Sequence, residues 1–330
     1  MPSTSEPDPL SEALRNVRLS GAIFLDAELT APWGFASPPT GATARLLAPS
    51  AEHLILFHLL LEGSATARVA GEPAVVLEPG DIAVLPRGDA HDLWNGRAPE
   101  LVDGSVLLPR ILAGGVVSER GGGGGRATKL VCGYVGCDRQ AQRLFLEGLP
   151  PLFKVNIRRD ASGGWIESAI RHLASEAGVA GAGRSALLAK LAEALFIETL
   201  RRYMAELPRQ RTGWLAAARD AAVGRALGAI HREPAHGWTV ASLAQRAGVS
   251  RTVFAQKFAR LLGEPPLSYV ARCRMQLGAR LLETTDDTVL QVALSAGYES
   301  EAAFNRAFKR ELGLPPARYR SQRRAGKPAA

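Results

Sequence analysis

The stretch that decides the fold of the C-terminal part is Ser250-Arg-Thr-Val-Phe-Ala-Gln-Lys-Phe258, which returns fifty positions later as Ser300-Glu-Ala-Ala-Phe-Asn-Arg-Ala-Phe308. Each copy continues through Leu-Gly and Pro-Pro to a tyrosine at the same spacing. Each is also preceded by a short apolar segment that ends at a glycine, residues 243–248 and 292–297. A short helix, a glycine turn and a second helix therefore occur twice, which is the pattern of two helix-turn-helix units.

Positive charge is concentrated in the same part of the chain. From Trp214 to the end there are 18 Lys and Arg against 9 Asp and Glu, a net charge of +9, whereas the preceding 213 residues carry 22 against 23, a net charge of −1. Basic surfaces attract polyanions, and phosphate contacts supply most nonspecific affinity for nucleic acid. A generally basic protein would spread its charge evenly, so this asymmetry indicates that the duplicated helices bind DNA.

The composition excludes several classes of protein. The chain has 330 residues and 46% hydrophobic content, which is typical of a soluble protein with two domains. No apolar run approaches the roughly 20 residues that span a bilayer, and the polar start at residues 1–8 does not resemble a signal peptide. Three cysteines, Cys132, Cys137 and Cys273, are too few for a disulfide framework. We therefore expect a cytoplasmic protein without a membrane partner.

Residues 20–137 have the pattern of an all-β domain, after a flexible N-terminus at residues 1–19. Short apolar or alternating runs are separated by Gly, Pro and Asp turns; the runs are 54–61, 66–69, 74–77, 82–85 and 101–102. Such spacing predicts a β-sandwich or barrel. The five-glycine run at 121–125 is expected to be a mobile loop rather than regular structure.

The pattern becomes helical in residues 138–206. Helices are predicted over residues 165–177 and 185–207. The second has a broad apolar stripe formed by Leu187, Leu188, Leu191, Leu195, Phe196 and Leu200. This stripe could pack on the β-domain or on the same helix of a second subunit, so the region is a candidate for dimerisation. A linker is predicted at residues 207–219, and the chain after it is helical.

Helical spacing separates the buried and exposed faces of the second helix in each repeated unit. The two phenylalanines of each copy share an inward face, because residues four apart lie on the same side of a helix. The outward residues are Thr252, Gln256 and Ala259, flanked by Arg251 and Ala255, in the first copy, and Ala302, Arg306 and Lys309, beside Asn305, in the second. Arg can contact guanine O6 and N7, amides suit adenine, and Ala or Thr can meet a thymine methyl group. Because the two faces differ, we expect two unlike DNA half-sites.

The segment at residues 266–282 is predicted to join the two units as one long helix. A helix of fixed length would hold the two recognition helices at a set distance. Successive major-groove faces on one side of B-DNA lie about 34 Å apart. The expected target is therefore one face of duplex DNA over two helical turns, bound by a single polypeptide.

Three stretches carry a more specific pattern: Trp238-Thr-Val-Ala-Ser-Leu-Ala-Gln-Arg-Ala-Gly-Val-Ser-Arg251, Ala293-Leu-Ser-Ala-Gly-Tyr-Glu-Ser-Glu-Ala-Ala-Phe-Asn-Arg-Ala-Phe-Lys309 and Gly313-Leu-Pro-Pro-Ala-Arg-Tyr-Arg320. They resemble the DNA-binding domain of AraC/XylS-type transcriptional regulators. The resemblance implies such a domain at residues 220–321, with helix-turn-helix units at about 239–262 and 289–312, followed by a basic tail at 322–330. By position it implies DNA contacts from Arg251, Thr252, Ala255 and Gln256, and from Glu301, Ala302, Asn305 and Arg306.

The N-terminal part contains Gly80-Asp-Ile-Ala-Val-Leu-Pro-Arg-Gly-Asp-Ala-His-Asp-Leu-Trp-Asn95, which fits G-x5-P-x-G-x2-H-x3-N. This stretch resembles the second conserved motif of cupins and implies a cupin-like β-barrel at residues 20–137. The first cupin motif normally supplies two histidines and a glutamate to a metal. Here only His58 and Glu62 are present, and Leu56 stands where the first histidine would be.

Two interpretations of the remaining donor residues stay open. His58, His91 and Cys132 could hold zinc, because His and Cys are among its usual ligands. Alternatively they are structural histidines and an ordinary buried thiol. The mouth of a barrel is the natural place for a small molecule, and the aromatic residues that could line it, or belong to the core, are Trp33, Trp94 and Tyr134.

The order of cupin-like barrel, helical pair and AraC-type domain resembles a known subfamily of these regulators. It implies a multidomain α and β protein that binds promoter DNA, more often as an activator, and responds to a small-molecule effector. RNA polymerase and a second copy of the chain are the other implied partners. The leading hypothesis is thus a regulator and not an enzyme. The alternatives are a metal-dependent cupin enzyme fused to a DNA-targeting domain and a constitutive, architectural DNA binder.

Overall fold

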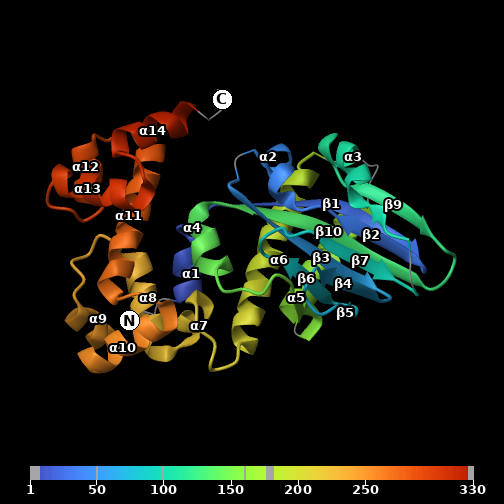
Figure 1. Cartoon of the computed structure of the whole chain (residues 1–330), viewed down its shortest axis with the longest axis horizontal. Coiled ribbons are helices and arrows are strands. Elements are labelled where there is room, and N and C mark those ends of the chain that lie inside the picture. Colours follow the sequence, from blue (N-terminus) through green and yellow to red (C-terminus); the bar gives the residue numbers. More distant parts are fainter. Residues whose placement is uncertain (1–7, 50, 98–99, 160, 176–181, 326–330) are drawn as a thin grey trace. The chain divides into compact units, whose positions relative to one another are not determined.

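The computed structural model describes residues 8–49, 51–97, 100–159, 161–175 and 182–325, and the chain forms two compact units (Figure 1). The first, called the sheet unit, runs from Arg18 to Leu207. The second, called the helical unit, combines the described residues up to Val17 with the chain from Pro208 onward. No helix within these ranges is long and apolar enough to cross a membrane.

The sheet unit is built on two sheets. In the described residues the larger sheet has the strand order β11-β6-β3-β10-β1-β9 and the smaller has the order β5-β4-β7-β2-β8. The bounds are β1 Leu19–Thr30, β2 Trp33–Ser37, β3 His53–Glu62, β4 Ala65–Val69, β5 Val75–Leu77, β6 Asp81–Leu85, β7 His91–Asn95, β8 Val102–Asp103, β9 Val117–Gly122, β10 Ala127–Cys137 and β11 Phe153–Asn156. The predicted sheet-rich N-terminal domain is confirmed, and β11 extends it past the predicted boundary.

The two sheets share one apolar core. Leu56 and Leu60 of β3 lie in the same buried cluster as Ala67 of β4 and Leu93 of β7, which belong to the smaller sheet. Side chains alternate along a strand, so only every second residue of β3 points into this cluster. The intervening residues of β3 are buried as well. This double burial explains why β3 reads as a continuous apolar run rather than as an alternating one.

Helices α5 (Ala161–Ser175) and α6 (Arg184–Glu206) belong to the same unit. α6 packs on β1 at close range, because a Cβ atom at Gly21 would lie only 2.4 Å from the backbone oxygen of Ala189. The buried residues of the predicted apolar stripe are Leu188, Leu191, Leu195, Phe196 and Leu200. Most of the stripe is thus covered within the monomer, whereas Leu187 is 50% exposed, and dimerisation through this region stays a prediction.

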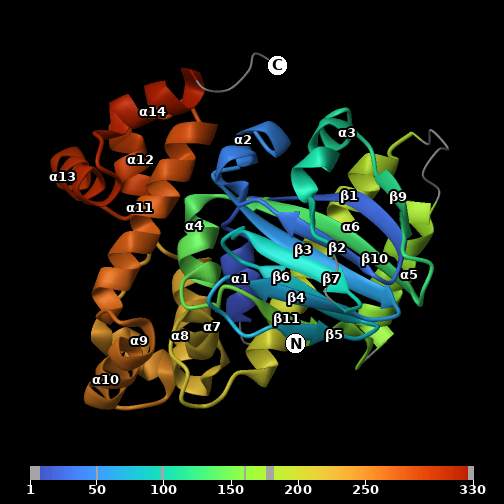
Figure 2. The same cartoon turned by 45° about the vertical axis from the view of Figure 1, so that its right-hand side comes forward.

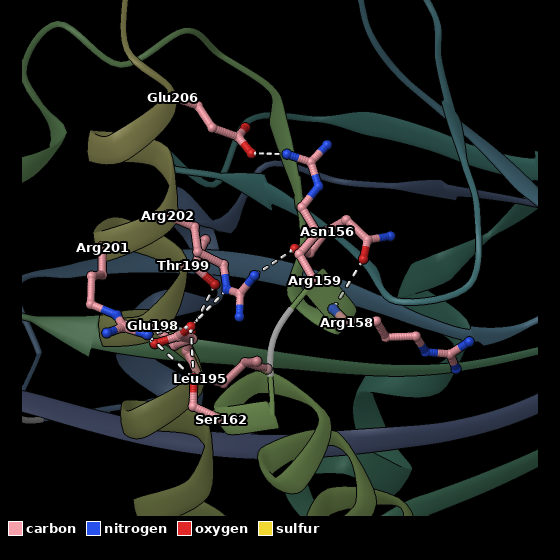
Figure 3. Close-up of polar contacts among 10 residues, drawn as sticks. All are labelled: Asn156, Arg158, Arg159, Ser162, Leu195, Glu198, Thr199, Arg201, Arg202 and Glu206. Carbon is pink, nitrogen blue, oxygen red and sulfur yellow. Dashed lines mark hydrogen bonds and ion pairs between the residues drawn. The ribbon is translucent and has the colours of Figure 1, made fainter.

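Polar contacts fix α6 against the segment that precedes α5 and against the start of α5 (Figure 3). Glu198 and Arg202 form a buried ion pair, with Oε1 and Nε 2.7 Å apart. Arg202 also donates to the backbone oxygen of Asn156 at 3.1 Å, and Arg201 contacts both Glu198 and Ser162. Removing one partner of a buried pair leaves an uncompensated charge. These contacts therefore fix the position of α6 along the sheet.

The glycine run at 121–125 is partly regular, in contrast to the prediction. Gly121 and Gly122 end strand β9 and pair with Leu29 and Thr30 of β1. At Gly122 the φ angle is +113°, and a Cβ atom there would lie 2.0 Å from the backbone oxygen of Thr30. Glycine is needed for this close approach of two backbones.

The helical unit contains two helix-turn-helix pairs, α9 with α10 and α12 with α13, and α11 contacts both pairs (Figure 2). The bounds of its described helices are α1 Pro9–Leu14, α7 Trp214–Arg219, α8 Ala221–Arg232, α9 Val240–Ala247, α10 Arg251–Leu262, α11 Pro266–Thr284, α12 Val289–Ser295, α13 Glu301–Leu312 and α14 Pro316–Ala325. The pairs predicted at 239–262 and 289–312 are confirmed. The predicted basic tail begins inside α14, and residues 326–330 lie outside the described residues.

Each helix-turn-helix pair has its own set of three aromatic rings, two from Phe and one from Tyr, at corresponding positions. In the first pair Phe254, Phe258 and Tyr269 are fully buried. The centroids of the two phenylalanine rings lie 5.5 Å apart, and Tyr269 meets Phe258 edge-on at 5.6 Å. In the second pair both corresponding distances are 5.3 Å. The repeat in sequence is therefore a repeat of packing geometry, in which each aromatic pair adds about 0.5–1.5 kcal/mol beyond the area it buries.

The N-terminal segment, predicted to be flexible, contains a helix of the helical unit. Asp8 caps α1 by accepting hydrogen bonds from the N–H groups of Leu10 and Ser11, and Pro9 takes the first helical position. Leu10 and Ala13 are buried, and α1 packs against α8. The prediction of a flexible start is wrong for these residues, because a short capped helix needs only two apolar positions to dock.

Side chains within and after α1 anchor the segment further. Asn16 donates to the backbone oxygen of His231 at 2.9 Å and accepts from Arg280 at 2.7 Å. The buried carboxylate of Glu12 pairs with Arg232 at 3.2 Å. The chain then enters the sheet unit and returns only after residue 207. It therefore passes between the two units twice.

The predicted linker at 207–219 is shorter in the structure. Trp214 is buried at the start of α7, and its Nε1–H donates to Tyr269 Oη at 2.7 Å. His231 Nε2 lies 2.7 Å from the same oxygen. These contacts make α7 part of the helical unit, which leaves residues 208–213 as the connection.

Leu10→Ala is expected to loosen the helical unit, because it leaves a cavity where α1 packs on α8. Removing a buried leucine costs about 2–5 kcal/mol, and a short terminal helix is expected at the lower end. Amide exchange in α8, followed by mass spectrometry, should accelerate by about tenfold or more. The matched control is Leu267→Ala, since Leu267 is 45% exposed. Equal acceleration in both variants would contradict the packing role of α1.

The stability of the helical unit is expected to fall in mild acid. Burial, and secondly the Arg272 guanidinium, lower the pKa of His231 to about 3. Below about pH 6.5 the unfolded chain binds a proton that the folded chain does not, so this group reduces stability as the pH falls toward 3. The slope is at most about 1.4 kcal/mol per pH unit. In urea unfolding, His231→Gln should flatten the pH dependence below about pH 6 by up to that amount. An unchanged slope would disprove the assignment.

Candidate nucleic-acid interface and internal cavity

The two recognition helices, α10 and α13, begin in the same way. The side chains of Ser250 and Ser300 each accept a hydrogen bond, at 3.3 Å, from the backbone N–H three residues further on. Gly248 and Gly297 have positive φ angles in the preceding turns, a conformation that other residues rarely adopt. The backbones at the starts of the two helices are thus alike, and the helices differ in the side chains that they expose.

The side chains predicted to contact DNA are accessible on both helices. The exposed ones are Arg251, Thr252 and Gln256 on α10 and Glu301, Ala302, Arg306 and Lys309 on α13, whereas Ala255 and Asn305 are half-buried. Sequence reasoning overlooked Arg310, which is exposed and lies four residues after Arg306 on the same side of α13. Helical spacing alone could have found it. The roles of these residues toward DNA remain predictions.

Besides the cationic side chains that form ion pairs, two further sets in the helical unit differ in their contacts. Arg225, Arg274 and Arg320 donate to backbone oxygens and thereby hold helix ends in place. By contrast, Arg306 and Lys309 have no intramolecular ion pair or side-chain hydrogen bond within the part of the chain that the structure describes. Their charges are free to meet phosphates or base edges.

The sheet unit contains a partly open cavity of about 120 Å³ between its sheets. Both sheets line it, and the short helices α2 (Ala44–Leu47) and α3 (Leu108–Leu112) contribute Leu47 and Ile111. Most lining side chains are apolar, and none of those in the described ranges is Asp, Glu, Lys or Arg. The cavity is therefore an uncharged space with a few polar groups.

The three residues predicted as metal ligands meet in this cavity. His58 of β3 and Cys132 of β10 lie opposite each other in the antiparallel register, and His91 comes from β7 in the other sheet. His58 Nδ1 is 2.8 Å from Cys132 Sγ, and His58 Nε2 is 2.7 Å from His91 Nε2. His91 Nδ1 lies 3.0 Å from the backbone oxygen of Asp89. The four groups form a chain of hydrogen bonds across the core.

One direction of hydrogen bonding satisfies the whole chain. The oxygen of Asp89 can only accept, so His91 donates from Nδ1 and accepts at Nε2. His58 then donates from Nε2 and accepts from the Cys132 thiol at Nδ1. Burial lowers the pKa of both histidines, with an added effect of His91 on His58, and burial raises the pKa of Cys132. All three side chains are therefore neutral near pH 7.

This geometry does not fit the predicted zinc site. Zinc needs ligand atoms that converge on one centre, but the two ring nitrogens of His58 face opposite partners, Cys132 and His91. Across the described residues, no group of three His, Cys, Asp or Glu side chains could hold a metal ion. Glu62 points away and pairs with Lys129 at 3.5 Å. We therefore replace the zinc site by a hydrogen-bonded chain.

Of the three aromatic residues predicted to line a ligand pocket, only Trp33 lines the cavity. Trp94 follows an inward-facing leucine on β7, so alternation turns its ring outward, where Arg68 Cζ lies 5.4 Å from the ring centroid. Tyr134 packs beside the core, and its hydroxyl donates to the backbone oxygen of Leu47 at 2.6 Å. Trp94 and Tyr134 therefore contact other parts of the protein and do not line the cavity.

Comparison with known families agrees with this division of the chain. Residues 8–205 match the cupin family, and residues 243–322 match a helix-turn-helix domain. The first match covers more than half of the chain. The protein is therefore a cupin in its N-terminal part, joined to a helix-turn-helix domain.

The chain is 34% identical to an AraC-like transcription regulator of Streptomyces lividans, over 82% of this chain and 88% of that protein. It is 29% identical to the HTH-type transcriptional regulator AlkR of Acinetobacter baylyi, over 96% of this chain and 99% of that one. The solved DNA-binding domain of AdpA, in complex with a target DNA, is 34% identical over 34% of this chain and 99% of that domain, with a TM-score of 0.32. The chain belongs to the AraC-like transcription regulators and is a DNA-binding transcriptional regulator.

We expect Arg306 of α13 to contact bases and Lys309 to contact phosphate. Arg306→Ala is expected to reduce affinity for the preferred sequence by about 1–3 kcal/mol and to leave random DNA almost unaffected. Lys309→Ala, the control, should weaken both DNAs equally and lower the salt dependence by about one ion. Titrations of both variants with both DNAs at several salt concentrations test this. Equal losses on specific and random DNA for Arg306→Ala would refute its role in base reading.

Proposed function

We propose that this regulator activates promoters that it recognises with α10 and α13, and that a small molecule bound in the cavity of the sheet unit controls it. The observation that carries the proposal is the pairing, in one chain, of two exposed recognition helices with an uncharged internal cavity. A DNA-binding protein that no ligand controls would need no cavity. A ligand-binding domain without a DNA-binding surface that carries cations such as Arg306 would have no transcriptional output to control.

In the proposed complex the two recognition helices read adjacent major-groove segments. α11, which contacts both pairs, has 19 residues, a length of about 28 Å, against about 34 Å between successive groove faces. Arg306 would contact guanine and Gln256 adenine, and the small side chains of Thr252 and Ala302 would meet thymine methyl groups. Since one chain carries both helices, binding does not need a second copy.

Control by a ligand requires two states of the protein with different affinity for it. The cavity borders on β3, β7 and β10, so an occupant would contact the chain of hydrogen bonds through His58 that ties the sheets together. A ligand that binds one arrangement of these strands more tightly would shift the population toward it. DNA affinity, or contact with RNA polymerase, would change in turn.

Activation is supported by a relative. The chain is 29% identical to the RCS-specific HTH-type transcriptional activator RclR of Escherichia coli, over 82% of this chain and 85% of that protein. As an activator the protein would act with RNA polymerase at the promoter, and we propose the bacterial cytoplasm as its site of action. The alternative, a metal-dependent cupin enzyme, has no support from the described residues, because His58 is engaged at both ring nitrogens.

The proposal is tested on operator DNA selected from a randomised duplex library with the full chain. The affinity for this operator, and output from a reporter that carries it, are then measured across a panel of small metabolites. Wild type is expected to respond to at least one compound. Ala27→Leu should bind the operator but not respond, because Ala27 is buried and lines the cavity.

The matched control is Ala70→Leu, the same substitution at an exposed position of the sheet unit. It should respond as wild type does. Constant operator affinity and constant reporter output of wild type across the panel would show a constitutive DNA binder. An undiminished response of Ala27→Leu would show that the effector binds elsewhere.

A further inference from the structure

The size of the cavity limits what it can hold. Its volume of about 120 Å³ is close to that of apolar protein cavities of about 150 Å³ that take up benzene. Leu25, Leu56, Leu93 and Leu130 contribute walls from both sheets, and these residues are buried. Close-packed strands do not move apart easily. A ligand of this size contains one six-membered ring or a short chain of similar volume.

The cavity is also selective against charge. No ionised side chain lines it in the described residues, and the two histidines that do are held neutral by burial. A carboxylate or an ammonium group would lose its hydration there without gaining a counter-charge, which is strongly unfavourable. A charged group placed inside the cavity is therefore strongly disfavoured.

One buried donor among the residues that line the cavity has no hydrogen-bond partner in the described part of the chain. His58, His91 and Cys132 satisfy one another along the chain that ends at Asp89. Trp33 also lines the cavity and is only 5% exposed, yet its Nε1–H has no acceptor among the described residues. Buried donors in proteins nearly always have a partner. The missing partner is a hydrogen-bond acceptor.

We infer that the cavity binds a compact, uncharged molecule of about one ring in size, whose carbonyl or ether oxygen accepts a hydrogen bond from Trp33 Nε1–H. The inference rests on the proposed function for its biological meaning, but the binding itself does not depend on it. The ligand class is thus aromatic or short-chain ketones, aldehydes, esters and ethers.

Three probes of similar size test the inference on the wild-type full chain by calorimetry or ligand-observed NMR. Acetophenone has a ring and a carbonyl, ethylbenzene lacks the oxygen, and benzoate carries a charge. Acetophenone is expected to bind about five- to tenfold more tightly than ethylbenzene, the usual effect of one hydrogen bond. Benzoate is expected not to compete with acetophenone. Failure of acetophenone to bind, or equal binding of benzoate, overturns the inference.

Trp33→Phe keeps an aromatic ring and removes the donor. It should lower the affinity for acetophenone about five- to tenfold and change that for ethylbenzene less than about twofold. The matched control is Trp94→Phe, which changes an outward-facing ring and should affect neither probe. If Trp33→Phe weakens both probes equally, the ring only fills space, and the assigned hydrogen bond is wrong.

Operator affinity measured with the same probes separates this inference from the proposed function. If acetophenone binds but operator affinity and reporter output respond to no compound, the ligand class stands and the regulatory role fails. If transcription responds only to charged compounds, and acetophenone does not bind, the regulatory role stands and the ligand class fails. These two results therefore distinguish a failure of the regulatory role from a failure of the ligand class.

Discussion

The buried hydroxyl of Tyr269 is the point at which the helical unit is joined, because three helices meet at this one atom. It accepts from Trp214 Nε1–H of α7 and lies 2.7 Å from His231 Nε2 of α8, while its own ring comes from α11. Desolvation keeps the pKa of His231 low, so the imidazole is neutral and accepts the tyrosine proton. In the second copy Tyr319 donates to Glu283 instead, and it is half-buried. The same ring thus organises the centre of the unit in one copy and its edge in the other.

Local patterns made the helical unit predictable from sequence, whereas contacts distant along the chain did not. The helix bounds follow from Ser250, Ser300 and the glycine turns, since caps and turns act within a few residues. His58 and Cys132 meet through a strand register between segments 74 residues apart, which no local pattern fixes. Their meeting was anticipated from zinc chemistry, but the direction of the ring nitrogens, which excludes zinc, depends on backbone geometry. The docking of α1 was missed for the same reason.

The two units handle polar groups in opposite ways. In the helical unit Arg306 and Lys309 have no ion-pair partner among the described residues, and they lie at the surface, where hydration stabilises a free charge and a phosphate can replace the water. The sheet unit buries His58 and Cys132 and keeps them neutral, because an unpaired charge there would be destabilising. In this interior the Nε1–H of Trp33, like Oδ2 of Asp89, is buried without a partner among the described residues. Departures of this kind from local rules are expected at functional sites.

The docking of α1 on α8 makes the helical unit discontinuous in sequence. A fragment that begins at Pro208 would carry both helix-turn-helix pairs and still lack the residues that cover α8, because Leu10 and Ala13 come from the other end of the chain. Conversely, cleavage within residues 208–213 would cut only one of the two covalent connections, and the fragments would remain associated through the docked helix. The segment from Asp8 to Val17 therefore acts as a built-in complementing peptide for the DNA-binding unit.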